Sequence, residues 1–117
     1  MTIDSRALLY DVHSALGPGF MHMHYRRATQ IELRRHDVPY EVRKEITLQF
    51  RRQPIETRET RLIIVDKRVL LIPIAVRAIT PLQRQRLRQY LKLLDLKLGL
   101  IANFHAPSLE IETVRIQ

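Results

Sequence analysis

The chain has 117 residues, 45% of them hydrophobic, which predicts a single domain over residues 1–117 and leaves no room for two independent cores. It has no cysteine, which excludes disulfides and thiolate metal sites, and its 3 glycines argue against a phosphate-cradling loop. The 20 basic residues, 16 of them arginine, outnumber the 12 acidic ones, and the net charge of +8 fits either a polyanionic partner or a solvated basic surface.

The sequence also indicates where in the cell the protein is located. The first six residues contain no basic region followed by an apolar one, so no signal peptide is expected. The longest apolar run, 69–76, contains Pro73 and is far shorter than the roughly 20 residues that span a bilayer. A soluble, cytoplasmic protein with no membrane partner is therefore predicted, and the absence of cysteine fits a reducing compartment.

Two helices are predicted first. Apolar residues recur at helical spacing up to Leu16, Asp4 or Ser5 can cap the start, and Gly17-Pro18-Gly19 ends the helix. A second helix is predicted from His22 to His36, with a thin apolar side and an arginine-rich opposite side. Successive turns of its inward side are marked by Tyr25, Ala28, Ile31 or Glu32, and Arg35.

Three strands are predicted next. Residues 40–50 alternate in the manner of a half-buried strand, and the chain turns at 51–54. Strands follow at 60–65 and 69–76, joined by a tight turn at 66–68. The run 69–76 is apolar on both sides, which is typical of a central strand, although Pro73 lacks a ladder donor.

The last third of the chain predicts one helix and two strands. Thr80, Pro81 and Gln83 form a helix start with a capping box, and the helix runs to about Leu94. A buried strand at 98–104 and an edge strand at 109–116 follow. The predicted fold class is therefore α/β, with a mixed central sheet of about five strands flanked by about three helices.

Short matches spread over nearly the whole chain carry a family resemblance. They are Val12-His13-Ser14, Leu16-Gly17-Pro18-Gly19-Phe20, Tyr25, Ala28, Ile31-Glu32-Leu33-Arg34, Ala75-Val76, Thr80-Pro81, Tyr90-Leu91-Lys92, Leu98-Gly99-Leu100 and Asn103-Phe104. In this order they resemble the GxxExxY protein family, a branch of the PD-(D/E)XK nuclease superfamily. The resemblance implies a restriction-endonuclease-like fold.

The resemblance also implies where catalytic residues would stand, and this chain departs from the pattern at each position. The family's signature glutamate falls on His22, and its metal-binding aspartate falls on Leu62, or on Arg61 if the register slips by one. Its Glu-x-Lys pair falls on Ile72 and Ile74, and its helix-borne glutamine falls near Arg86 or Leu87. Because Mg²⁺ needs oxygen ligands, we expect no catalytic residue, no metal and no cofactor here.

Other metal or catalytic arrangements have little support in the sequence. His22 and His24 diverge on a helix, and a site with His13 or His105 would depend on the tertiary fold. A relocated nuclease site would need two carboxylates to converge. The candidates near the lost site are Glu59, Asp66 and Glu45, although Asp66 is most simply a turn residue.

Three functions remain open. The first is a catalytically inactive nuclease-fold protein that self-associates into a homo-oligomeric assembly through apolar patches and the edge strands 40–50 and 109–116. The second is a module that binds nucleic acid without cleavage, and the third is a divergent metal-dependent nuclease. The candidate phosphate-binding residues are Arg26, Arg27, Arg34, Arg35, Arg51, Arg52, Arg84, Arg86 and Arg88.

Overall fold

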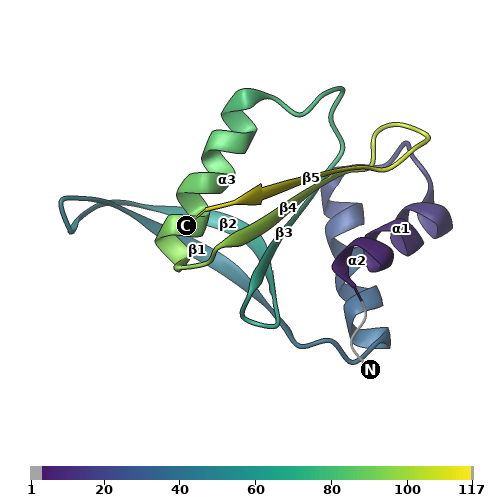
Figure 1. Ribbon diagram of the computed structural model, residues 1–117, viewed down its shortest axis with the longest axis horizontal. Helices are drawn as coiled ribbons and strands as arrows, with labels where there is room; N and C mark the ends of the chain where they lie inside the picture. The colour runs from purple at the N-terminus through teal and green to yellow at the C-terminus, as the bar shows by residue number, and fades with distance from the viewer. Residues whose placement is uncertain (1–3, 117) are drawn as a thin grey trace.

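The computed structural model describes residues 4–116, which form a five-stranded mixed sheet with three helices (Figure 1). The strands lie in the order β1-β2-β3-β4-β5; β3 and β4 are parallel and the other neighbours are antiparallel. The predicted α/β class and element order are confirmed. The elements are α1 (Ser5–Leu16), α2 (His22–Arg35), β1 (Tyr40–Phe50), β2 (Gln53–Val65), β3 (Val69–Ile74), α3 (Pro81–Leu94), β4 (Leu98–Asn103) and β5 (Glu110–Arg115).

The sheet separates two hydrophobic layers. Side chains alternate between the faces of a strand, so Ile63 and Leu71 pack with α1 and α2, whereas Ile64 and Leu70 pack with α3 on the opposite face. Figure 1 shows α1 and α2 together on one side of the sheet and α3 on the other. The central strand β3 is therefore covered on both faces, as its apolar sequence predicts.

Local sequence signals set the helix boundaries. Asp4 caps α1 by accepting the N–H of Arg6, and Thr80 and Gln83 form the predicted capping box of α3. The predicted inward side of α2 is wrong in part, because Ile31 is 49% exposed. Tyr25 is buried as predicted, and the other buried side chains of α2 are Thr29 and Leu33, at four-residue spacing.

Pro73 lies in the central strand without breaking a ladder. The carbonyl of Ile74 accepts the N–H of Phe104, so the peptide groups of Ile74 face β4. Adjacent residues of a strand direct their peptide groups to opposite sides, so Pro73 faces the β2 side. There the pairing of β2 with β3 has already ended at Ile63 and Leu71. The missing N–H of proline therefore costs no ladder bond.

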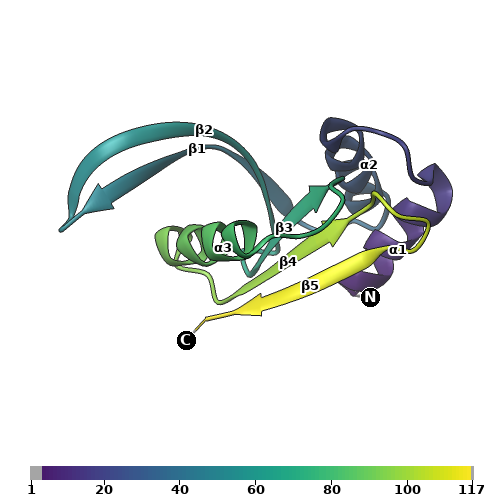
Figure 2. The same ribbon diagram turned by 90° about the horizontal axis from the view of Figure 1, so that it is seen from above.

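Beyond this point β1 and β2 continue as a two-stranded ribbon, here called the arm (residues 44–60). The turn prediction at 51–54 is wrong in length: only Arg51 and Arg52 form the turn, with φ of 50° and 67°, and β2 starts at Gln53 instead of Thr60. Positive φ at both positions is typical of tight two-residue hairpin turns. Figure 2 shows the arm arching over α3 and projecting past it. Ile46 packs against the α3 layer near the base of the arm.

Candidate functional site

The sheet forks where β2 leaves β3, and the fork creates a depression. Pairing between the strands stops at Ile63 and Leu71, so the following residues of β3 no longer face β2. A depression of about 170 Å³ opens there, beside the carboxyl end of β3. Its lining includes residues from α2, β2, β3 and α3: His22, Arg26, Glu59, Thr60, Arg61, Leu62, Leu71, Ile72, Pro73, Ile74 and Tyr90.

The positions singled out by the family resemblance meet at this fork. His22, Leu62, Ile72 and Ile74 all line the depression, although they lie on three different elements. Arg86 lines an adjoining depression of about 190 Å³, which shares Leu62, Ile72 and Ile74. The structure therefore brings all five positions to one corner of the molecule.

Three of the residues that line the fork at the family's catalytic positions have hydrocarbon side chains. Leu62 and Ile74 are only 7% and 8% exposed, and they join the hydrophobic layer beneath α3. Ile72 is half-buried in the same layer. None of these three side chains has a lone pair or a charge, so none can ligate a metal ion or position a water molecule.

The carboxylates considered for a relocated site separate in the structure. Glu59 lines the depression, and Glu45 pairs with it directly across the β1–β2 ladder. Asp66 lies in the β2–β3 turn with φ of 52°, at the other end of the hairpin. Asp66 is therefore the turn residue that its sequence position indicates, and at most Glu59 and Glu45 can act together.

Two guanidinium groups line the depression, and only Arg26 was predicted to bind phosphate, whereas Arg61 was considered only as an alternative position of the family's metal-binding aspartate. Arg26 comes from α2, and Arg61 comes from β2. Partial burial, together with the charges of Arg61 and Arg27, lowers the pKa of Arg26 below its ordinary value. Among residues 4–116, the ion pairs involve neither Arg26 nor Arg61. Arg61 does donate one hydrogen bond of 2.7 Å, to the carbonyl of Thr60.

The histidines of the N-terminal half have separate structural roles. His13 lies 2.9 Å from the Ala106 carbonyl, and His22 lies 3.2 Å from the Ala75 carbonyl, each through Nε2. His24 accepts the N–H of Met21 through Nδ1 at 3.0 Å. Each ring therefore has its own backbone partner, and the three do not form a common ligand set.

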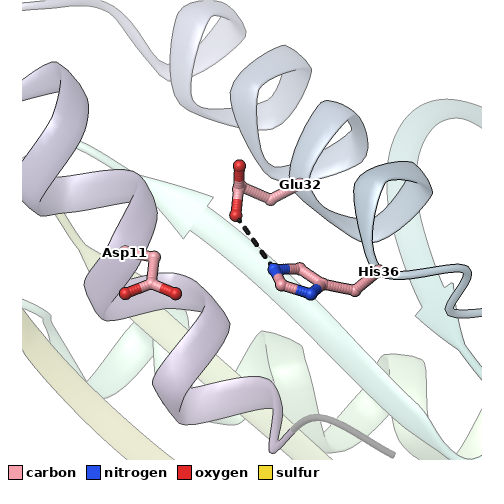
Figure 3. Close-up of side chains that lie close together, drawn as sticks. All are labelled: Asp11, Glu32 and His36. Atoms are coloured by element: carbon pink, nitrogen blue, oxygen red, sulfur yellow. Dashed lines mark ion pairs between the residues drawn. The ribbon is translucent and has the colours of Figure 1, made fainter. Parts of the chain in front are cut away.

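One group of potential metal ligands was not predicted from the sequence. Asp11, Glu32 and His36 lie between α1 and the end of α2, with one potential ligand atom from each within 4.8 Å of the others (Figure 3). Glu32 and His36 have the i,i+4 spacing that could have drawn attention to them, but only the fold adds Asp11. Glu32 already pairs with His36 at 3.4 Å and with Arg35 at 2.5 Å, so both of its oxygens are engaged.

The nine predicted phosphate-binding arginines do not form one surface. Arg26 and Arg86 lie at the fork, whereas Arg35 pairs with Glu32, and Arg84 pairs with Glu112 at 2.6 Å. The bond to Glu112 raises the pKa of Arg84 above its ordinary value. Arg34 donates to the hydroxyl of Tyr40, and Arg51 lies over the ring of Phe50 at the tip of the arm. Arg27, Arg52 and Arg88 are exposed on α2, the arm turn and α3.

The fold and the fork define an endonuclease-type α/β sheet, and comparison with protein families gives the same assignment. A family model described as the PD-(D/E)XK nuclease superfamily matches residues 2–116. The chain belongs to this superfamily. Comparison with curated proteins gives no match, and comparison with solved structures gives none either. No helix within residues 4–116 is long and apolar enough to cross a membrane.

Proposed function

We propose that this chain is a non-cleaving member of the superfamily that works by self-association, as a building block of a homo-oligomer. The loss of catalysis rests on the hydrocarbon side chains at three positions of the fork where the family resemblance places catalytic residues. A metal-dependent nuclease needs oxygen ligands that hold Mg²⁺ next to the phosphate and activate water. Leu62, Ile72 and Ile74 supply none of these ligands, and the charges of Arg26 and Arg61 oppose a cation at the same place.

Self-association is supported by one observation above all: the outer part of the arm, beyond Ile46, has no covering layer. Residues 53–59 of β2 are all exposed, and β1 is an edge strand with one side unpaired. Isolated two-stranded ribbons are marginally stable in water, and exposed edges pair readily with other chains. Phe50 and Ile55 are 60% and 67% exposed near the tip. A second copy of the chain would cover these side chains and close the assembly symmetrically.

Light scattering of the size-separated protein tests the assembly. We expect a mass that is a multiple of 13.9 kDa at micromolar concentration. The double variant Phe50→Ser/Ile55→Ser is expected to dissociate. Leu82→Ser is the matched control, because Leu82 is also an exposed apolar residue (62%) but lies on α3. A monomeric wild-type protein, or equal dissociation of the control, would refute self-association through the arm.

A cleavage assay tests the loss of catalysis separately. Duplex and single-stranded DNA and RNA are incubated with the protein and Mg²⁺ or Mn²⁺, and no cleavage is expected. If cleavage occurs and disappears in Glu59→Ala or Glu45→Ala, these two carboxylates form a relocated site and the proposal is wrong. Asp66→Ala serves as the control, since Asp66 lies in the turn at the other end of the hairpin.

A further inference from the structure

The fork brings two arginines without a glutamate partner to one depression. Arg35, Arg43, Arg58 and Arg84 each pair with a glutamate. Arg26 and Arg61 both line the depression, close enough for the charge of Arg61 to lower the pKa of Arg26, and within residues 4–116 neither joins an ion pair. Bringing two like charges together costs free energy unless an anion lies between them.

The only carboxylate in the lining does not supply that anion. Glu59 is exposed, and no ion pair within the described chain joins it to Arg26 or Arg61. Its single negative charge also leaves the two guanidinium groups with a net positive charge.

The adjoining helix start adds to the positive potential. Helix α2 begins at His22, which lines the depression, and its first turn contains no acidic residue. The N-terminus of a helix carries a partial positive charge, which acidic side chains or bound anions usually offset. Met21, the N-cap residue, offers no side-chain oxygen to the free N–H groups.

The charges around the depression favour a phosphate group as the ligand. A guanidinium presents a planar fork of N–H donors that matches the oxygens of a phosphate, and two such groups can contact one phosphate from two sides. A neighbouring depression of about 450 Å³ shares His22 and Arg26 and is lined by Phe20, Met21 and Met23. A group attached to the phosphate, such as a nucleoside, would have an apolar surface there.

We propose that the fork binds a phosphate group directly between Arg26 and Arg61, without a metal ion. This inference rests on the proposed loss of metal chemistry, because it places guanidinium groups where a metal-dependent enzyme would hold a cation. It does not depend on self-association. The phosphate can belong to a free ion or to a nucleotide strand, and the two sources are distinguishable by experiment.

Isothermal titration calorimetry in the presence of EDTA, at constant ionic strength, tests the site. The probes are inorganic phosphate, a 5′-phosphorylated thymidine dinucleotide and the same dinucleotide without its terminal phosphate. We expect saturable binding of the first two probes and tighter binding of the phosphorylated dinucleotide if the apolar depression holds the attached group. Equal affinity for the first two probes would assign the site to the free ion.

Variants connect the binding to the fork. Arg26→Gln and Arg61→Gln each remove a charge-assisted contact and are expected to weaken phosphate binding by about tenfold or more. Arg115→Gln is the matched control, because Arg115 is exposed on β5 and lines neither depression; the affinity of this variant should equal that of the wild type. Arg61 is exposed, so Arg61→Gln is expected to fold even if Arg26→Gln does not.

Three results would overturn the inference: no saturable binding of phosphate, equal weakening by Arg115→Gln, or binding only after Mg²⁺ replaces EDTA. The third result would also count against the proposed loss of metal chemistry. The first two would leave the cleavage and light-scattering results unaffected, so failure of the phosphate site can be recognised separately.

Discussion

One strand, β2, runs through two different environments. Ile63 lies between helices on both faces of the sheet and is fully buried, whereas Ile55, in the arm of the same strand, is 67% exposed. Both residues belong to the strand that pairs with β1 from Gln53 to Val65, although the register shifts twice along the ladder. Strand formation in the arm is therefore maintained by backbone pairing, while burial depends on the helices that cover the sheet. Stability should reside in the covered part, and the arm should be free to contact partners.

The largest effect on stability is expected in the covered part, at Phe104. This side chain is fully buried and stacks on Tyr25 with ring centroids 4.4 Å apart. Phe104→Ala should lower the free energy of unfolding by about 3–5 kcal/mol, because it removes apolar contacts and leaves a cavity. Urea denaturation measures the change. A decrease in the free energy of unfolding of less than about 1 kcal/mol would mean that the side chains around Phe104 are less tightly packed than the stacked rings indicate.

A smaller effect is expected at Asn103, at the end of β4. Its amide donates to the Val76 carbonyl at 2.9 Å and accepts the Val76 N–H at 3.0 Å, which holds the segment after β3 in place. Asn103→Ala should cost about 1–3 kcal/mol, because it leaves polar groups without partners. Gln49→Ala, which truncates an exposed amide in the arm, is the control and should be nearly neutral. Equal decreases in the free energy of unfolding for the two variants would contradict the expectation that stability resides in the covered part of the sheet and not in the arm.

The smallest effect on folding is expected in the arm itself. Ile55→Ser should change the free energy of unfolding by less than about 0.5 kcal/mol, since the side chain makes little buried contact within one copy. The measurement requires a protein concentration at which light scattering shows monomers, because association would otherwise stabilise the wild type. A loss of several kcal/mol would show that the arm is part of the core and would remove its role as a free surface.

Local sequence signals predicted most of the fold. The capping box at Thr80 and the apolar run at 69–76 led to the correct helix and central strand, because each signal acts through neighbouring residues. The first half of β2 was missed for a physical reason. Residues 53–59 have no apolar alternation to detect, since all seven are exposed, and Pro54 resembles a turn residue.

The candidate site was predictable only in part. The resemblance placed His22, Leu62, Ile72 and Ile74 in one functional group, and the fold brings them to one depression. The sequence could not predict that Arg61 lies near Arg26. Their proximity depends on the tertiary fold, in which β2 separates from β3 beside the start of α2. The same limit applies to Asp11, which joins Glu32 and His36 only when α1 and α2 pack together.

The parallel pairing of β3 with β4 has a consequence for refolding. Strands β1, β2 and β3 follow one another through short turns, whereas β3 can meet β4 only after the chain has passed through α3. Contacts that close a long loop form slowly, because chain entropy opposes them. We expect the meander of β1, β2 and β3 to form early in refolding. The pairing of β3 with β4, which ends at Ile74 and Asn103, is expected to limit the refolding rate. The depression beside Ile74 would then be completed in that last step.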